Sequence, residues 1–321
     1  MRAGLAALSL TAIITTAQAE PVEVTASPVS SFQTIGFSTV FGPFTWRGGL
    51  ALESETESFG GLSGLVLADN CEDLLAVSDQ GNWFRARLTF DGDTLKGIER
   101  SELSPILDSK GRPQRNKNWA DAETLTPLGD GKIGVAYERR VRFGSYDVKT
   151  HGLDAPFRVI PHPKAIDLGP ENGEVEAFGL LPSGSHIAIA ERQRDGKGNT
   201  RAWIWRGKQV TEFSIARHDS YNVTDLVVLP DGAVLTMERS FTKTSLPGMA
   251  VRRFATDTIK AGMMIEPELL LEASVPFYKI DNMEGIATCT RNGETRVTLL
   301  SDNNFNTSVQ STLLLQFSYA P

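Results

Sequence analysis

The chain has 321 residues, of which 40% are hydrophobic and 22% charged, and its formal net charge at pH 7 is −7. This composition is typical of a globular protein, and a chain of this length can bury one large core. The negative charge gives no electrostatic support for a nucleic-acid or anionic-membrane partner, but it suits sites for metal ions.

Residues 1–19 have the features of a secretory signal peptide. They contain Arg2, an apolar run from Ala3 to Ile14, and small residues at Ala17 and Ala19. The apolar run is too short to span a bilayer, and no other stretch is apolar enough to do so. We therefore expect cleavage after Ala19 and a periplasmic or secreted mature protein.

Residues 121–139 predict an antiparallel hairpin. Two apolar runs flank the turn Gly129-Asp-Gly131, with Glu123 at the start of the first run and Glu138 at the end of the second. Antiparallel pairing places both ends at one edge, so these two carboxyl groups should lie side by side.

The same unit recurs along the chain. Its first polar position is occupied by Ser63, Glu123, Glu176, Asp225 and Glu284. Its second is occupied by Asp79, Glu138, Glu191, Glu238 and Asp302. Short strands repeating every ~40–60 residues are typical of a β-propeller.

We therefore predict an all-β fold with one propeller over residues 46–321, preceded by a lead-in over residues 20–45. The predicted number of blades is five, and a sixth within residues 20–60 is the alternative. The last unit lacks a fourth strand, which Phe44–Leu52 can supply by pairing with Thr312–Tyr319 and closing the ring.

Cys71 and Cys289 are the two cysteines of the chain, and both follow the first strand of a unit. They belong to the first and last units, which become neighbours when the ring closes. In an oxidising compartment we expect them to form a disulfide at the end opposite the acids. A catalytic thiol is the weaker alternative, because neither cysteine has a histidine nearby in sequence.

The acids of the first position should converge on the propeller axis, where they need a counter-charge. Carboxylate and amide oxygens favour calcium over zinc, although another divalent cation would also fit. The predicted metal ligands are Glu123, Glu176, Asp225, Glu284, Asp302 and Asn303. The alternative is that the acids, above all those of the second position, only tie one blade to the next.

Basic side chains offer a second source of counter-charge. Arg139, Arg192 and Arg239 each follow an acid of the second position, and neighbouring residues in a strand should point to opposite faces. The loop over residues 108–119 adds further positive charge, and its side chains would hold an anionic substrate or would simply be solvated. They are Lys110, Arg112, Arg115 and Lys117. His218 is the one histidine expected at the acid-bearing end, where a plain loop histidine is the alternative.

Several motifs together resemble the family described as esterase-like activity of phytase. They are Gly60-Gly-Leu-Ser-Gly64, Asp121-Ala-Glu-Thr-Leu125, Val175-Glu-Ala-Phe-Gly179, Tyr221-Asn-Val-Thr-Asp-Leu226, Val234-Leu-Thr-Met-Glu-Arg239, Asn282-Met-Glu-Gly-Ile286 and Leu300-Ser-Asp-Asn-Asn304. The resemblance covers about residues 55–320. It implies an exported propeller rich in acids and a hydrolase that acts on ester bonds.

Three functions remain open at this point. The first is a metal-dependent hydrolase of phosphate esters, the second a lactonase or carboxylic esterase, and the third a non-catalytic ligand-binding propeller. For a hydrolase, the predicted catalytic residues are Glu123, Glu176, Glu284, Glu138 and Arg139. The predicted contacts to a small anionic or ester substrate are Arg192, Arg239, Lys117 and His218.

Overall fold

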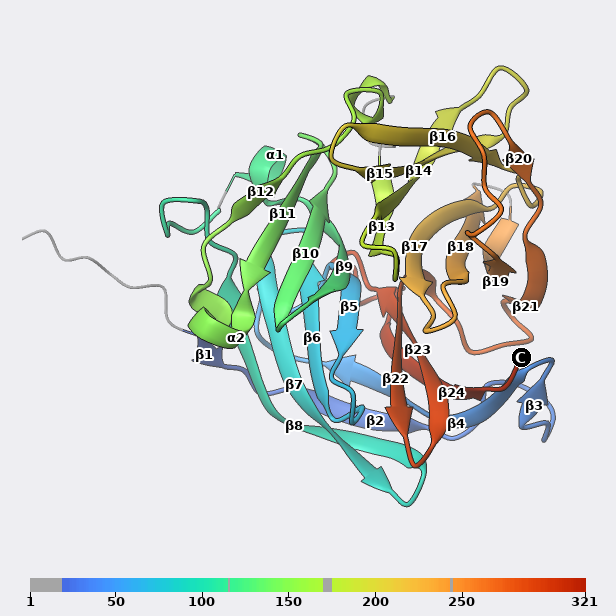
Figure 1. Cartoon of the computed structure of the whole chain (residues 1–321). Helices are drawn as coiled ribbons and strands as arrows, with labels where there is room; N and C mark the ends of the chain where they lie inside the picture. The colour runs from blue at the N-terminus through green and yellow to red at the C-terminus, as the bar shows by residue number, and fades with distance from the viewer. Residues whose placement is uncertain (1–18, 115, 170–174, 243–244) are drawn as a thin grey trace, which may run out of the picture.

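The structure is a computed structural model that describes residues 19–114, 116–169, 175–242 and 245–321. The predicted signal segment up to residue 18, and Arg115 of the basic loop, lie outside these ranges. Five antiparallel sheets surround a central axis and form the predicted five-bladed propeller (Figure 1).

Each blade is a sheet whose strands run from the axis outward. Blade 1 contains β5 (Leu62–Leu67), β6 (Asp73–Ser78), β7 (Asn82–Asp91) and β8 (Thr94–Pro105). Blade 2 contains β9 (Ala122–Gly129), β10 (Lys132–Tyr137), β11 (Arg142–Asp147) and β12 (Arg158–Ile160). Blade 3 contains β13 (Val175–Leu180), β14 (His186–Arg194), β15 (Thr200–Arg206), β16 (Gln209–Ile215) and the short parallel strand β20 (Met264–Ile265).

The last two blades complete the ring. Blade 4 contains β17 (Asn222–Val228), β18 (Val234–Thr242), β19 (Ser245–Phe254) and β21 (Glu268–Ser274). Blade 5 contains β22 (Asn282–Arg291), β23 (Glu294–Asp302), β24 (Thr312–Tyr319), β4 (Phe44–Glu53) and β2 (Thr25–Val29). The innermost strands β5, β9, β13, β17 and β22 contact one another in this order, and β22 returns to β5.

The ring closes as predicted, because the C-terminal strand β24 pairs antiparallel with the N-terminal strand β4. Two more N-terminal strands lie at blade edges: β1 (Glu20–Pro21) pairs with β8, and β2 pairs with β4. A short strand β3 (Val40–Phe41) folds back on β4. The outer edge of the C-terminal strand β24 is thus paired rather than exposed.

The hairpin predicted over residues 121–139 consists of β9 and β10. Asp130 and Gly131 have φ values of 52° and 74° at its turn. Two successive residues with positive φ make the Asp-Gly pair the right one for a tight hairpin.

Apolar side chains fill the five interfaces between neighbouring blades, with one buried cluster at each interface. Alternate residues of each strand face one neighbour or the other, so the strands read as nearly continuous apolar runs. β24 shows this most fully, since all eight of its residues are buried.

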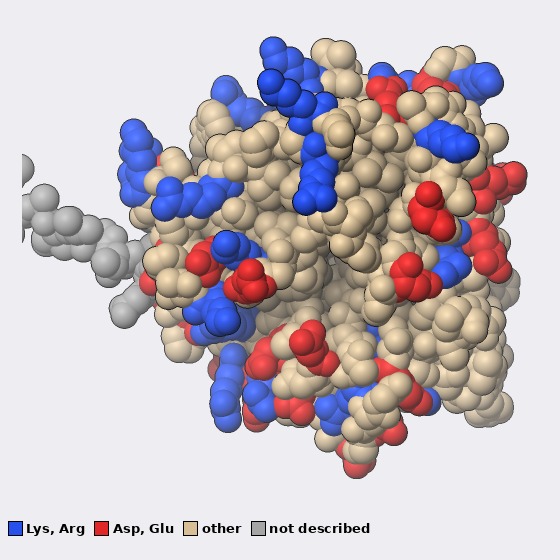
Figure 2. Space-filling view, viewed as in Figure 1, with Lys and Arg blue, Asp and Glu red and all other residues tan. Residues whose placement is uncertain are grey.

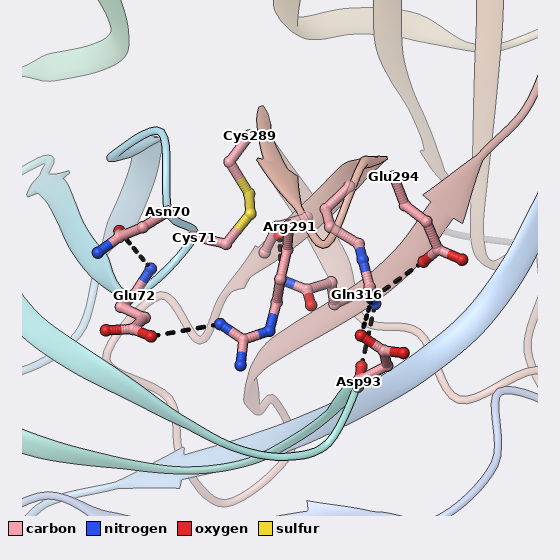
Figure 3. The surroundings of a disulfide bond; sticks show 10 residues. Asn70, Cys71, Glu72, Asp93, Cys289, Arg291, Glu294 and Gln316 are labelled. Carbon is pink, nitrogen blue, oxygen red and sulfur yellow. Dashed lines mark hydrogen bonds and ion pairs between the residues drawn. A yellow bond between two sulfur atoms is a disulfide. The ribbon is translucent and has the colours of Figure 1, made fainter.

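Cys71 and Cys289 form a disulfide that joins blade 1 to blade 5, with their Cα atoms 5.3 Å apart. Beside it, Arg291 Nη1 lies 3.3 Å from Glu72 Oε1, so an ion pair spans the same two blades (Figure 3). The covalent link therefore fastens the junction at which the N- and C-terminal parts of the propeller meet.

Helices are short: α1 (Lys117–Ala120) and α2 (Val148–His151) have four residues each. Among the described residues, no helix reaches the length and apolarity needed to cross a membrane. Figure 2 shows basic and acidic side chains distributed over the face seen in Figure 1.

Candidate metal and active site

The predicted acids come to one end of the propeller because of a β-bulge repeated in every inner strand. The pairing of each inner strand with the second strand shifts by one residue near its start. The residues left out of the pairing are Ser63 with Gly64, Glu123, Glu176, Thr224 and Glu284. Bulges re-aim side chains, which explains how these polar residues leave the apolar blade interfaces.

The bulges correct the sequence alignment in blade 4, where Thr224 and not Asp225 holds the equivalent position. Asp225 lies one residue further along, where the other inner strands have Gly64, Thr124, Ala177 and Gly285. A Cβ at Gly64 would come within 2.6 Å of the backbone of Thr124, so the inner strands approach closely there. The larger side chain of Asp225 lies among these small residues.

Asp225 is fully buried and holds three inner strands together. Its Oδ1 accepts hydrogen bonds from Thr124 Oγ1 (2.5 Å) and from the backbone N–H of Leu226 (2.8 Å). Its Oδ2 accepts one from the N–H of Ile286 (2.9 Å). Burial raises the pKa of Asp225 well above its usual range, while these three bonds oppose the shift. Both oxygens accept hydrogen bonds, and Asp225 belongs to neither of the three-carboxyl groups described next.

Two groups of three carboxyl oxygens could hold a cation. Asp121, Glu123 and Glu138 form one, and Glu138, Glu176 and Glu191 form the other; within each group the oxygens lie within 4.8 Å of one another. The first group lies on blade 2, the second spans blades 2 and 3, and the two share Glu138. Carboxylate triads of this kind match the ligand preference of calcium or magnesium.

Glu176 is the most informative member, because it is 8% exposed and has no hydrogen bond or ion pair within the described residues. Burial raises the pKa of Glu176 well above its usual range, and the charge of Glu191 adds to the effect. Burial and the charge of Glu176 likewise raise the pKa of Glu123. A buried carboxylate without a partner is costly, so these groups either bind protons or need a cation.

The predicted basic residues each contact an acid of this region. Lys117 Nζ lies 2.5 Å from Asp79 Oδ2 and 2.7 Å from Asp121 Oδ1, which joins blades 1 and 2. Arg139 Nε lies 2.7 Å from Asp121 Oδ2, within blade 2. These two cations pair with Asp79 and Asp121 and form no ion pair with Glu123 or Glu176, and Asp79 Oδ1 has no hydrogen-bond partner among the described residues.

The end of the propeller that carries these acids is called the acidic mouth. Elsewhere in the mouth, Arg192 and Arg239 form ion pairs with Glu191 and Glu284. Arg239 crosses from blade 4 to blade 5 and donates to Glu284 and to Asn282 Oδ1 (2.6 Å). Arg192 Nε lies 2.9 Å from the carboxylate of Glu191, its neighbour in sequence. The expectation that Glu191 and Arg192 point to opposite faces is wrong for their charged groups, because the Arg192 side chain turns back to reach the Glu191 carboxylate.

Glu284 and Asp302 lie on blade 5, outside both three-carboxyl groups. Burial raises the pKa of Glu284 to about 7, although Arg239 opposes the shift. Burial raises the pKa of Asp302 to about 6. Glu284 can therefore exchange a proton near neutral pH, as a general acid or base must.

Two other predicted residues have structural surroundings. Asn303 Oδ1 accepts hydrogen bonds from the N–H groups of Gly61 (3.3 Å) and Phe305 (3.1 Å), which fixes its loop against blade 1. His218 Nε2 lies 3.4 Å from Glu272 on β21, the outermost strand of blade 4. Neither residue joins a three-carboxyl group.

A cavity of about 700 Å³ opens beside the Glu138–Glu176–Glu191 group. Its wall includes Glu191, Arg192, Arg239 and several amides, among them Asn222 and Asn282. This volume lies within the range of small-molecule sites, which is ~300–1,000 Å³. A ligand in the cavity would meet two guanidinium groups and one carboxylate of the candidate cation site.

The sequence-based list of site residues lacks Asp121 and Glu191. Glu191 holds the second position of its unit, so the repeat itself marks it. Asp121 lies two residues before Glu123, and its backbone carbonyl accepts a hydrogen bond from the N–H of Glu138 (3.0 Å). This extra pair extends the hairpin by one step and brings Asp121 into the mouth.

The family model described as "Phytase-like: Esterase-like activity of phytase" matches residues 57–305. The chain belongs to this family. No curated protein matches the sequence of this phytase-like chain. A solved structure of a gluconolactonase from Xanthomonas campestris is similar over 95% of this chain and 99% of its own, with 10% identity and a TM-score of 0.43. At that level the likeness carries no argument about function, whereas the family supports a hydrolase- or esterase-like propeller.

Proposed function

We propose that this phytase-like chain is an exported, metal-dependent hydrolase of phosphate esters. The observation that carries the proposal is Glu176, a buried carboxylate without a hydrogen bond or ion pair to any described residue, placed in a three-carboxyl group beside a cavity with two guanidinium groups. Convergent carboxyl groups with raised pKa values in a concave site are typical of functional sites.

Glu138, Glu176 and Glu191 are the residues that would hold a calcium ion, and Asp121 and Glu123 offer a second set of oxygens around Glu138. A bound divalent cation would neutralise this cluster and polarise a phosphoryl oxygen. No histidine or cysteine belongs to either group, which argues against zinc at this site.

Arg192 and Arg239 line the cavity and would bind the anionic group of the substrate. Arg192 is the more available of the two, since its side chain is 54% exposed. Arg239 is anchored between Asn282 and Glu284, so it would present its charge from a fixed position. A phosphate ester offers an anionic group to these guanidinium groups, which a neutral ester lacks.

Glu284 is the candidate general acid or base. Its pKa of about 7 allows it to accept a proton from an attacking water or to return one to a leaving group at neutral pH. Its contact with Arg239 places it next to the residue that would hold the substrate.

A carboxylic ester or lactone is the second candidate substrate class, and the family description itself favours it. The same ion and the same Glu284 would serve that reaction. Faster turnover of lactones or aryl acetates than of aryl phosphates, abolished by Glu284→Gln, would support this alternative.

The test is hydrolysis of an aryl phosphate, a bis-aryl phosphate and an aryl acetate by the chelator-stripped protein, before and after calcium is restored. We expect calcium to restore phosphate-ester turnover in the wild type and in the control Glu212→Gln, which changes an ion pair on the outer strand β16. A folded, calcium-binding protein that turns over none of the three substrates would overturn the proposal and favour a non-catalytic ligand-binding propeller.

Export is the remaining element of the proposal. The Cys71–Cys289 disulfide is compatible with an oxidising compartment, and residues 1–19 have the pattern of a signal peptide. N-terminal sequencing of protein recovered from the periplasm or medium should give Glu20 as the first residue. An intact Met1 on protein confined to the cytoplasm would contradict export.

A further inference from the structure

A second cavity lies away from the acidic mouth, between the loop that begins at Asp108, helix α1 and strand β11. Its volume is about 400 Å³, and its wall includes Arg112, Gln114, Trp119, Arg142 and Phe157. Its wall contains no member of the cation groups and none of the predicted substrate contacts Arg192, Arg239, Lys117 and His218. It is therefore a separate concave site.

Arg142 brings an uncompensated positive charge to this cavity. Its guanidinium donates to Gln114 Oε1 (2.7 Å), to the carbonyl of Arg140 (3.2 Å) and to the carbonyl of Trp119, all of which are neutral acceptors. No carboxylate among the described residues forms an ion pair with Arg142 or Arg140. Burial lowers the pKa of Arg142, as expected for a partly buried cation without a counter-ion.

The other cation of the wall does not change this balance. Arg112 is paired with Asp108 through two hydrogen bonds of 2.9 Å and 2.7 Å, so the two charges cancel. Among the described residues of the wall, Arg142 is therefore the cation without a carboxylate partner, and Arg140 lies close by. In a chain whose net charge is −7, such a site selects for an anion through its local field.

Aromatic side chains determine the shape of the ligand. Trp119 is 44% exposed, and its ring centre lies 4.5 Å from the guanidinium carbon of Arg140 and 5.2 Å from that of Arg142. Phe157 and Pro113 add apolar surface to the wall. An exposed indole beside apolar surface suits a flat, apolar group that can stack or lie in contact with it.

Helix α1 separates the two sites. Lys117 at its start contacts Asp79 and Asp121 in the acidic mouth, whereas Trp119 lines the second cavity. One turn of helix thus has the mouth on one side and the cavity on the other. The second site can be tested without reference to hydrolysis.

We propose that this cavity binds a small organic anion with a flat apolar group, recognised by the charge of Arg142 and the indole of Trp119. Either a carboxylate or a phosphate monoester supplies the required charge. The guanidinium of Arg142 has two N–H groups that are not committed to the acceptors named above, and these can donate to the anion. The site differs in ligand and position from the proposed cation site.

The test is calorimetric titration of the chelator-stripped full-length protein with benzoate, phenyl phosphate and the neutral benzamide. We expect 1:1 binding of one or both anions and an affinity for benzamide lower by about tenfold or more, because benzamide lacks the charge that strengthens a hydrogen bond from Arg142. Benzoate and phenyl phosphate show which anionic group is preferred. Equal binding of benzamide, or no binding of either anion, would overturn the proposal.

Variants locate the binding event. Arg142→Gln and Trp119→Leu should each weaken anion binding by about tenfold, whereas Arg158→Gln, at an exposed arginine on the same blade, should leave it unchanged. Glu176→Gln should also leave it unchanged, which separates this site from the mouth. If Arg142→Gln does not fold, Trp119→Leu alone tests the site, because Trp119 is exposed and its replacement should not disturb folding. Wild-type anion affinity in Trp119→Leu would contradict the proposed binding site.

Discussion

Glu176 and Asp225 are buried carboxyl groups on the inner strands of neighbouring blades, and burial raises the pKa of both. They differ in their partners: Asp225 accepts three hydrogen bonds, and Glu176 has none within the described residues. A one-residue bulge produces the difference, because Glu176 occupies the bulge of its strand and Asp225 follows the bulge of its own. The comparison shows that a shift of one residue within the repeat separates a structural bridge from a candidate cation ligand.

The largest expected effect is on stability. Asp225→Ala should lower the free energy of unfolding by about 3 kcal/mol or more, because it leaves the Ile286 N–H and the Thr124 hydroxyl buried without their acceptor. Urea unfolding in the presence of a chelator measures this change. Glu176→Gln, the matched variant, should change the unfolding free energy by less than about 1 kcal/mol or raise it, because it removes a buried charge. Equal losses of unfolding free energy in Asp225→Ala and Glu176→Gln would contradict the difference between the two acids.

For turnover we expect the opposite ranking, with a larger effect at Glu176 than at Asp225. Glu176→Gln should reduce kcat/KM for a phosphate ester by about a hundredfold, because it removes an oxygen of the cation site. Asp225→Asn keeps the shape of the side chain, and the fraction that folds should retain turnover. Initial rates normalised to folded protein provide the measurement. A variant at Asp225 that folds fully but loses turnover would place Asp225 in the active site after all.

Calcium should stabilise the protein through the same residue. At a free concentration of 100 times Kd, binding to the native state alone contributes about 2.7 kcal/mol. Thermal unfolding with and without calcium should therefore show a higher Tm for the wild type and no shift for Glu176→Gln. An unchanged calcium shift in Glu176→Gln would mean that the ion binds elsewhere.

A weaker effect concerns pH. Carboxyl groups whose folded pKa exceeds the unfolded value bind more protons in the native state, so stability falls as pH rises between the two values. For Glu284 this window runs from about 4.5 to about 7. Chelator-stripped protein should lose stability across it, with a slope of at most about 1.4 kcal/mol per pH unit for one group. Saturating calcium should weaken this dependence of stability on pH. Stability that rises with pH in the stripped protein would contradict the raised pKa of Glu284.

The sequence predicts the fold well because the repeated unit has a strong local signature. Five blades are predicted by the short apolar runs, the Gly129-Asp-Gly131 turn and the spacing of the acids. The need to cover a sheet edge predicts the pairing of β24 with β4. These features depend on residues close together in the chain or on a general rule about edges.

The arrangement of the site residues is harder to predict from the sequence. Counting along the strands cannot distinguish Thr224 from Asp225, because the bulge adds one residue without changing the composition. The path of Arg192 back to Glu191 depends on side-chain conformations, and the contact between His218 and Glu272 depends on the last strand of its blade. The second cavity combines Arg142 with Trp119, which belong to different elements and share no motif.

Calcium titration of the chelator-stripped protein, followed by calorimetry, tests the central claim most directly. We predict saturable binding to the wild type and to folded Asp225→Asn, and loss of that binding in Glu176→Gln. Undiminished calcium binding by Glu176→Gln, or loss of binding only in Asp225→Asn, would contradict the account.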